Sequence, residues 1–420
     1  MRIIQIIPSI SLVYGGPSQM VLGLSAALAA KNIDVTIITT NSNGDIGQPP
    51  LDVPLNQPIK QNGYQIIYFR CSPFRRYKFS LSLLQWLNEN ARQFDIAHIH
   101  ALFSPVTTLA ATIARGHHLP YIIRPCGMLD PADLQKKKQL KQIYGKLLER
   151  PNLAGAAAIH FTSKQEAKIS ERFGLGDTGK MPVPKDLVIP LGVTADCDRH
   201  FISQVDATNI ERTEVLTTNL SVANFYPQRL RESQVPIILF MSRIEPKKGL
   251  NLLIPALESI LEAGIEFCFI LAGSNPQDAD YETQIKVQIQ NSILARYTTI
   301  TGFVSGDLKS ELLRNADLFV LPSYYENFGI AVAEAMAAGV PVAISDRIHI
   351  AEDIRQAEAG WVGPLEVDAI ANSIKSALLN PEERQRRGLN GKEYAKKHYN
   401  WEAIAQQTID AYQHILSSIN

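Results

Sequence analysis

The chain has 420 residues, of which 45% are hydrophobic and 20% are charged, as in globular proteins with a sizeable core. Its formal net charge is zero, and we expect no nucleic-acid partner. No apolar run approaches the roughly 20 residues that span a bilayer, and the four widely spaced cysteines favour reduced thiols over a disulfide framework. We therefore expect a cytoplasmic protein whose membrane contact is at most peripheral, at the inner face of the plasma membrane.

The charge is unevenly divided along the chain. Residues 1–190 contain 21 Lys and Arg against 12 Asp and Glu, a balance of +9, whereas residues 191–420 contain 20 against 29, a balance of −9. A positive first half suits an anionic partner, and two solvated faces of different charge explain the pattern at least as well.

Short β-branched runs alternate with helical patterns throughout the first half. Because the runs are apolar nearly throughout, they predict a parallel sheet covered on both faces. The first run is broken by Pro8 too early for a signal peptide, and the Gly- and Pro-rich stretch at 41–58 predicts a surface loop. Residues 1–192 are therefore predicted to form one Rossmann-like domain, with strands at 2–8, 34–40, 64–70, 96–100, 120–125 and 156–163.

The same alternation restarts after a polar stretch. Residues 193–234 are rich in Asp, Asn, Thr, Ser and Gln and predict a long connector. A second Rossmann-like domain is predicted at 235–398 and a final helix at 399–420, where isoleucines recur with helical period. The predicted fold class is α/β, with two doubly wound parallel-sheet domains facing a central cleft. The strands of the second domain are predicted at 235–243, 266–274, 297–304, 316–323 and 340–346.

A Gly-Gly turn follows the first strand, in "YGGPSQMVLGLSAALA". Gly15 and Gly16 lie where a strand turns into a helix, so unpaired backbone N–H groups and the positive end of the helix dipole face the sheet edge. That arrangement suits a phosphate, and a plain tight turn is the alternative. The turn lacks the G-x-G-x-x-G pattern of dinucleotide-binding domains.

A histidine pair ends a later strand, in "DIAHIHALFSP". His98 and His100 share one face, and His100 lies nearer the carboxyl end, where ligands bind in open α/β sheets. A bond to a sugar hydroxyl and a packed, neutral core position are equally compatible with the spacing.

Cations follow the first strand of the second domain, in "SRIEPKKGLNLLIPAL". Arg243 leaves the strand, and Lys247 and Lys248 are predicted to open a helix, where the helix dipole disfavours them. A bound diphosphate would reverse that penalty, because Arg offers a planar fork and Lys a compact charge. Solvated surface lysines are the alternative.

Two glutamates eight positions apart flank a small-residue segment, "YYENFGIAVAEAM". A strand is predicted to end just before it, and a helix to run to Gly339. Eight helical residues rise about 12 Å and leave their ends roughly 80° apart. Glu326 and Glu334 could therefore face one groove at different depths and grip an elongated ligand with an anion between them. The apolar setting of Glu334 argues against simple solvent exposure.

These segments resemble the retaining nucleotide-sugar glycosyltransferases of family 4. The resemblance rests on "RIEPKKGL", "ILAGS", "TGFV" and "ADLFVLPSYYENFGIAVAEAMAAGVPVAISD", and in the first half on "PSISLVYGGPSQMV", "DIAHIHALFSP" and "IIRPCGMLDP". It runs from about Ile4 to Tyr412, and the two glutamates with their flanking strands are its most specific part. The family has the GT-B architecture of two Rossmann-like domains, the first facing the acceptor and the second binding the donor.

The resemblance implies a role for each matching residue. Glu326 would hold the hydroxyls of the donor sugar, Glu334 the ribose, and Arg243 with Lys248 the departing diphosphate. His100 would contact the sugar near its reacting carbon. The catalytic group would thus be Arg243, Lys248, Glu326 and His100, with donor-binding positions at Gly15, Gly16, Gly273, Phe303, Asn327, Phe328, Gly329 and Glu334, and with Arg124 on the acceptor side.

The reaction implied is transfer of a hexosyl group from a UDP- or GDP-linked sugar to a glycan or lipid-linked acceptor, with retained configuration. No cofactor and no metal are expected. The "DAD" at 278–280 resembles a metal motif of another architecture but is predicted to lie in a polar loop. A nucleotide-sugar epimerase of the same architecture and a non-catalytic sugar-nucleotide-binding subunit are the alternatives.

A basic segment, "DLQKKKQLKQIYGKLLER" at 133–150, has apolar residues at helical spacing and lysines crowded at its start. Such a helix could lie on an anionic membrane. We expect instead that it packs against the first domain and that its lysines are merely solvated.

Overall fold

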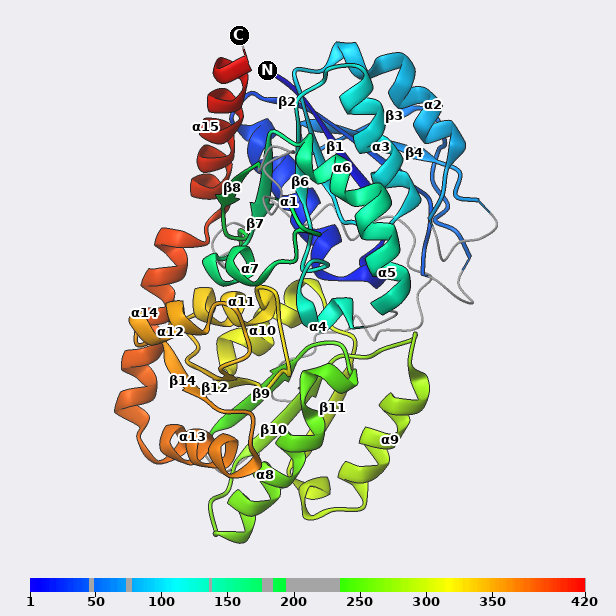
Figure 1. The fold of residues 1–420 in the computed structure, drawn as a ribbon. Coiled ribbons are helices and arrows are strands. Elements are labelled where there is room, and N and C mark those ends of the chain that lie inside the picture. The colour runs from blue at the N-terminus through cyan, green and yellow to red at the C-terminus, as the bar shows by residue number, and fades with distance from the viewer. Residues whose placement is uncertain (45–48, 73–77, 136–137, 176–183, 194–234, 420) are drawn as a thin grey trace. The chain divides into compact units, whose positions relative to one another are not determined.

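The structure is a computed structural model that describes residues 1–44, 49–72, 78–135, 138–175, 184–193 and 235–419 (Figure 1). The predicted connector at 193–234 lies outside these residues except for Val193. The chain divides into two compact units. The N-terminal unit comprises Met1–Gly192 and Trp401–Asn420, and the C-terminal unit comprises Val193–Asn400.

The N-terminal unit is built on an eight-stranded sheet. Its order is β3-β4-β2-β1-β5-β6-β7-β8, parallel except that β3 runs antiparallel to β4 at one edge. The central strands are buried on both faces, which is why their sequences are apolar nearly throughout. The strands are β1 (Arg2–Ser9), β2 (Asp34–Thr40), β3 (Pro58–Gln61), β4 (Tyr64–Phe69), β5 (Ile96–His100), β6 (Tyr121–Arg124), β7 (Ala158–Phe161) and β8 (Lys185–Val188).

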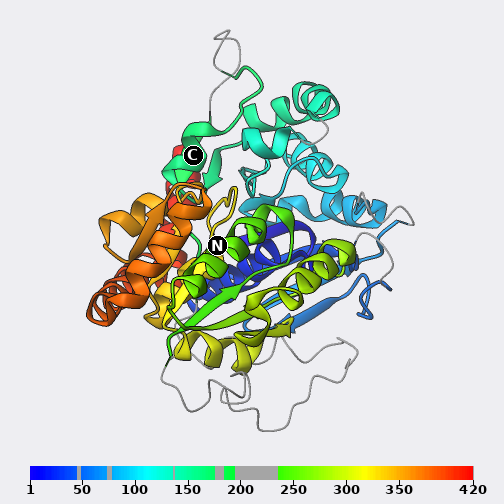
Figure 2. The same cartoon turned by 90° about the horizontal axis from the view of Figure 1, so that it is seen from below.

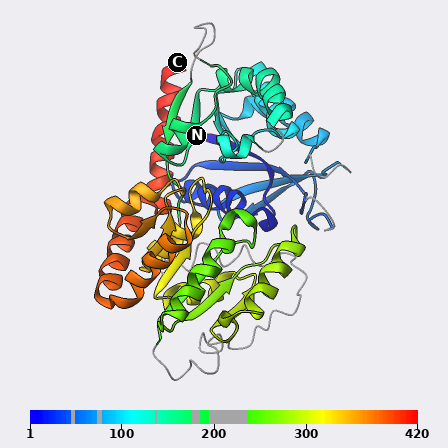
Figure 3. The same cartoon turned by 60° about the horizontal axis from the view of Figure 1, so that its bottom comes forward.

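The helices of this unit include the last helix of the chain. This helix, α15, packs against α1 (Figure 3). The indole ring of Trp401, at the start of α15, lies directly against the backbone of Gly23 and Gly192. A Cβ atom at either glycine would overlap the ring. The helices are η1 (Leu12–Tyr14), α1 (Gly16–Ala30), α2 (Leu81–Asn90), η3 (Ala91–Gln93), α3 (Pro105–Gly116), α4 (Pro131–Leu134), α5 (Lys138–Tyr144), the π-helix η4 (Gly145–Glu149), α6 (Arg150–Ala154), α7 (Lys164–Ile169) and α15 (Trp401–Ile419).

The C-terminal unit has a six-stranded parallel sheet in the order β11-β10-β9-β12-β13-β14. The chain order reverses between β9 and β12, so this is the switch point beside which ligands bind in doubly wound sheets. The strands are β9 (Ile237–Met241), β10 (Cys268–Ala272), β11 (Thr298–Gly302), β12 (Leu318–Leu321), β13 (Val342–Ser345) and β14 (Gly360–Gly363).

Helices flank this second sheet, and α8 and α9 lie side by side along it (Figure 2). The helices are η8 (Pro246–Lys248), α8 (Leu250–Glu262), α9 (Ala279–Gln290), η9 (Ile293–Arg296), α10 (Gly306–Asn315), α11 (Ile330–Ala338), α12 (Ala351–Gln356), α13 (Val367–Leu379) and α14 (Pro381–His398).

The predicted α/β class with two parallel-sheet domains is confirmed, and each predicted strand is present. The central cleft between the domains stays a prediction. The sequence patterns missed β3, β8 and β14. The last of these reads "GWVG", and its two glycines hide the strand signal. Gly360 lies so close to Val342 of the neighbouring strand that a Cβ would collide with that residue's carbonyl oxygen, which explains a glycine in a strand.

One local prediction is wrong, and another holds only in part. Lys247 and Lys248 do not open α8 but belong to the short η8, and Gly249 (φ 75°) is the N-cap of α8, whose first residue is Leu250. The segment expected to form one helix at 133–150 contains α4, α5, η4 and α6, and it packs against the unit only in part. The Tyr144 ring lies against Phe103, with centroids 5.9 Å apart, and the Tyr144 hydroxyl lies 2.8 Å from Oγ1 of Thr108. Leu140, Ile143, Leu147 and Leu148 are 63%, 60%, 68% and 47% exposed.

Candidate functional site in the two units

A charged cluster lies at the switch point of the C-terminal unit. β9 leads to Arg243 and η8, and the segment after β12 brings Glu326 beside them. Lys248 forms an ion pair with Glu326, and both side chains are buried, with 9% and 13% exposed. The Lys247 ammonium lies 3.7 Å from the same carboxylate oxygen, and Arg243 pairs with Glu245 at 3.2 Å.

Burial and pairing shift the pKa values in this cluster. Burial lowers the pKa of Lys248, and the Glu326 carboxylate offsets part of that effect. Burial by itself would raise the pKa of Glu326, but the ammonium groups of Lys248 and Lys247 outweigh burial and hold that pKa below its ordinary value. The cluster is therefore a partly dehydrated group of three cations held in place by two carboxylates, Glu326 and Glu245.

The backbone after Glu326 forms the start of α11. Gly329 adopts a left-handed conformation (φ 85°) as the N-cap, and no side chain caps the helix. The first N–H groups of α11 therefore carry the positive end of the helix dipole without a side-chain acceptor. Phe328 is buried and meets Tyr399 edge-to-face, with ring centroids 5.1 Å apart. Asn327 lies between Glu326 and Phe328 in the same turn.

Glu334 lies within α11, as the sequence predicted, and Gly339 ends the helix. Its Oε1 atom lies 2.5 Å from Nζ of Lys309 on α10, and the two side chains are 16% and 24% exposed. Phe303 is 54% exposed on the connection between β11 and α10. The sequence did not predict a role for Lys309, because nothing in the sequence around a lysine in a polar helix indicates that it pairs with Glu334 on another helix.

The Gly273 backbone passes close to a neighbouring strand end. Its φ angle is 145°, and a Cβ there would collide with the carbonyl oxygen of Ser242. Its N–H donates to the carbonyl of Gly302 at 2.7 Å. Close packing of the ends of β9, β10 and β11 thus accounts for the glycine whether or not a ligand is bound.

The predicted residues of the N-terminal unit lie around the carboxyl ends of β1, β5 and β6. Gly15 (φ 69°) is the N-cap of α1, and open space surrounds the position of its missing Cβ. Gly16 is the first residue of that helix. The anion-binding geometry expected of a strand–Gly–Gly–helix turn is therefore available at this edge.

His100 is fully buried in β5. Its Nε2 atom lies 2.5 Å from Oε1 of Gln5, and its ring stacks on His98 with centroids 4.4 Å apart. Burial and the nearby Arg124 guanidinium lower the pKa of His100 well below its ordinary value. The ring is therefore neutral and lies below the surface of the unit.

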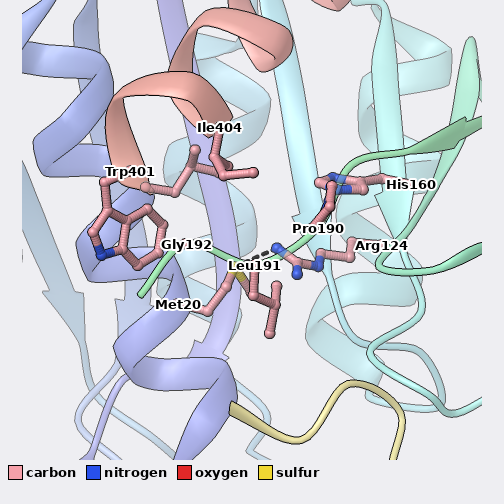
Figure 4. Close-up of a pocket in the computed structure, with 9 residues that line it drawn as sticks. Met20, Arg124, His160, Pro190, Leu191, Gly192, Trp401 and Ile404 are labelled. Atoms are coloured by element: carbon pink, nitrogen blue, oxygen red, sulfur yellow. Dashed lines mark hydrogen bonds between the residues drawn. The ribbon is translucent and has the colours of Figure 1, made fainter. Parts of the chain in front are cut away.

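Arg124 is also buried, at the end of β6 opposite His100. Its Nη1 donates to the Met20 sulfur, and its Nε has no hydrogen-bond partner in the described residues. Figure 4 shows the guanidinium beside a small pocket. The pocket is too small to admit a water molecule, and it is lined by Met20, Leu24, Arg124, His160, Pro190, Leu191, Gly192, Trp401 and Ile404.

Two further features concern metals and membranes. The described residues contain no group of three His, Cys, Asp or Glu side chains arranged to hold a metal ion. In the "DAD" sequence, Asp278 is instead the N-cap of α9 and accepts the N–H of Tyr281 at 3.3 Å. No helix in the described part of the chain is long and apolar enough to cross a membrane.

Solved structures share this two-sheet architecture across the whole chain. Sucrose-phosphate synthase from Thermosynechococcus elongatus superposes with a TM-score of 0.71 at 21% identity, covering 100% of both chains. The Anabaena protein HepE, solved in complex with UDP and glucose, superposes with a TM-score of 0.69 at 17% identity over 99% of this chain and 100% of that one. The fold is therefore that of the GT-B glycosyltransferases.

Sequence comparisons identify the family. The model of "Glycosyl transferases group 1" matches residues 223–394, and the model "Glycosyl transferase 4-like domain" matches residues 15–184. A phosphatidyl-myo-inositol mannosyltransferase of Mycobacterium leprae is 26% identical over 100% of this chain and 98% of its own length. The glycosyltransferase MJ1607 of Methanocaldococcus jannaschii is 35% identical, but the match covers 42% of this chain and 44% of that protein. The chain belongs to the group 1 glycosyltransferases.

Proposed function

We propose that this enzyme moves a hexosyl group from a UDP- or GDP-linked sugar to a glycan or lipid-linked acceptor, with retention of anomeric configuration. The cluster of Arg243, Lys247 and Lys248 at the switch point, beside the N-terminus of α11, carries the proposal. A diphosphate is the anion that such a set of cations and free N–H groups accommodates. The HepE structures, solved in complex with UDP and glucose and with UDP-glucose, support a nucleotide-sugar donor.

The chemistry follows from where charge develops. The bond between the anomeric carbon and the β-phosphate oxygen breaks, and its electron pair moves to the phosphate. Arg243 and Lys248 stabilise this negative charge, which is electrostatic preorganisation in a partly dehydrated site. The acceptor oxygen forms the new bond on the same face of the sugar, and its proton passes to the departing phosphate. The cations supply the charge stabilisation, so the scheme requires no metal.

The remaining residues take supporting roles in this scheme. Glu326 holds Lys248 until the diphosphate arrives and then binds hydroxyls of the sugar, together with the backbone of Asn327–Gly329. Glu334 binds the ribose, and Phe303 borders the base. Gly15 and Gly16 offer N–H groups to the donor phosphates, and Arg124 serves the acceptor. His100 is buried in β5, and its proposed role is to contact the sugar near the reacting carbon from within the sheet.

The test is release of nucleoside diphosphate from UDP-, GDP- and ADP-linked hexoses by the full chain, first without an acceptor and then with glycan and lipid acceptors. Slow hydrolysis without an acceptor is expected, and Lys248→Met should abolish it. Lys286→Met should leave it unaffected, because Lys286 pairs with Glu282 at 2.7 Å within α9 and not with a carboxylate of the cluster. The anomeric proton of the product, observed by NMR, reports retention. Conversion of the donor to an isomer without acceptor would establish an epimerase instead, and binding without any turnover would establish a silent subunit.

The exposed apolar stripe of α5 and η4 supports a membrane-bound acceptor. Leu140, Ile143, Leu147 and Leu148 are spaced as neighbours along one helical face, and each is about half exposed or more. Lys138 and Lys146 are exposed on the same segment. Apolar side chains of this size are rarely left exposed together, and lysines beside them match an anionic lipid surface. We propose that this stripe docks on an anionic membrane.

Vesicle flotation tests the docking. The full chain is expected to float with phosphatidylglycerol vesicles at low salt and not with phosphatidylcholine vesicles, and Leu147→Ser with Leu148→Ser should abolish flotation. Leu379→Ser with Leu389→Ser is the matched control, because those leucines are 63% and 57% exposed in the other unit. Absence of flotation would refute membrane docking. A dimer in solution that the Leu147/Leu148 changes dissociate would show that the stripe binds another copy of the chain instead.

A further inference from the structure

Lys309 is placed unfavourably for an ordinary surface lysine. It is the fourth residue of α10, which begins at Gly306 after the N-cap Ser305, and a helix N-terminus disfavours a cation. Its side chain is 24% exposed, so the ammonium is also partly removed from water. The contact with Glu334 at 2.5 Å is the interaction that compensates for both costs.

Glu334 is constrained by the same contact. Its neighbours on α11 are Ala333 and Ala335, both buried, so the carboxylate rises from an apolar helix with only 16% of its side chain exposed. Oε1 is occupied by Lys309, while Oε2 takes part in no hydrogen bond within the described residues. A carboxylate anchored through one oxygen has lost most of its rotational freedom and still offers the other oxygen to a ligand.

The surrounding elements have the composition of a nucleoside site. α10 packs against α11, and the connection that leads into α10 carries Phe303, whose ring is 54% exposed. A half-exposed aromatic ring, an anchored carboxylate and a cation therefore come from two adjacent helices and from the connection between β11 and α10. An aromatic face suits a base, and a fixed carboxylate oxygen suits vicinal hydroxyls.

We infer that Lys309 is a positioning residue for the nucleotide: it holds Glu334 in the single orientation in which the free carboxylate oxygen receives the ribose hydroxyls. The inference rests on the proposed nucleotide-sugar donor and adds a residue to that site. It predicts that the loss of Lys309 harms recognition of the ribose 2′-hydroxyl specifically, rather than nucleotide binding in general.

The test compares ribose with deoxyribose. Isothermal titration calorimetry gives the Kd of the full chain for UDP, GDP or ADP, whichever binds tightest, and for the 2′-deoxy form of the same nucleotide. Wild type should prefer the ribonucleotide by about tenfold or more, as expected of a hydrogen bond to a charged group. Glu334→Gln should reduce the preference to about threefold or less, because an amide oxygen is a weaker acceptor than a carboxylate.

The Lys309 variants complete a double-mutant cycle. Lys309→Met should reduce the preference to about threefold or less in the wild-type background and change it little in the Glu334→Gln background. Lys309→Arg, which keeps a cation within reach of the carboxylate, should retain more of the preference than Lys309→Met. Lys286→Met removes a lysine from another Lys–Glu pair of the same unit and should leave the preference unchanged.

Each other outcome has a definite meaning. If Lys309→Met weakens the binding of both nucleotides equally, Lys309 is merely structural and the inference is overturned. The same follows if its ribose preference equals that of wild type. If wild type binds no nucleoside diphosphate, the proposed function fails and the inference fails with it. If wild type and Glu334→Gln show the same preference, the ribose role of Glu334 is wrong although the donor proposal survives.

Discussion

The buried pair of Lys248 and Glu326 allows the stability of the site to be separated from its activity. Removing the carboxylate by Glu326→Gln leaves the buried Lys248 ammonium without the counter-charge that contacts it, whereas Lys247, 3.7 Å from Glu326, keeps Glu245 at the same distance. At an effective dielectric constant of about 20, one such attraction at this separation amounts to roughly 4 kcal/mol before desolvation is counted. Breaking a buried pair from one side costs about 3–5 kcal/mol.

The reverse change should cost less. Lys248→Met removes one ammonium but leaves Lys247 near the carboxylate, so we expect a loss of about 1–3 kcal/mol. The double variant Lys248→Met/Glu326→Gln replaces the pair with groups of similar size and no net charge. Its stability should return to within about 1 kcal/mol of wild type. All three variants should lose turnover, because each removes a group that binds the donor.

Amide hydrogen exchange of β9 and β12, followed by mass spectrometry, reports the stability of the C-terminal unit by itself. Lys286→Met is the control, since Lys286 is 38% exposed and its i,i+4 pair with Glu282 should contribute about 0.5 kcal/mol or less. If the double variant is no more protected than Glu326→Gln, the two side chains do not stabilise each other. Near-normal turnover in the double variant would remove both residues from the proposed mechanism.

Three further predictions concern the N-terminal unit. Replacing a glycine within a helix by alanine normally stabilises the helix. Gly23→Ala, however, would overlap the Trp401 ring and should lower the free energy of unfolding by about 1–3 kcal/mol. A raised urea midpoint would show instead that the ring moves freely. Acid should destabilise the unit, because burial lowers the pKa of His160 to about 3 in the folded chain. Between that value and the unfolded-state pKa of about 6.5, this histidine binds a proton only in the unfolded chain. The loss between pH 7 and pH 5 is about 2 kcal/mol from this residue, measured by urea unfolding, and His160→Gln should reduce it. Glu149→Leu leaves the Phe103 N–H, which the buried carboxylate accepts at 2.8 Å, unpaired, and should cost about 1–3 kcal/mol by the same assay against less than about 1 for Glu149→Gln. Equal losses would refute the assigned hydrogen bond.

The sequence alone determined the class of fold and the identity of the main charged residues. Apolar runs of five to eight residues followed by helical periods indicate parallel strands, because burial on both faces requires such runs. The placement of Glu326 before α11 and of Glu334 within it also followed from local signals, with glycines at both ends of the helix. These features depend on neighbours along the chain, which is why a sequence pattern contains them.

Contacts between distant segments were decided by the tertiary structure alone. Lys248 and Glu326 are 78 residues apart, and they meet because β9 and β12 are neighbours in the sheet. Lys309 gave no sign of its partner until α10 packed against α11. The leucines and the isoleucine of α5 and η4 looked like part of a packed face, yet the fold leaves them exposed and packs only Tyr144 against the unit. Helical spacing shows only that side chains share a face; whether another element covers that face depends on the packing of the rest of the chain.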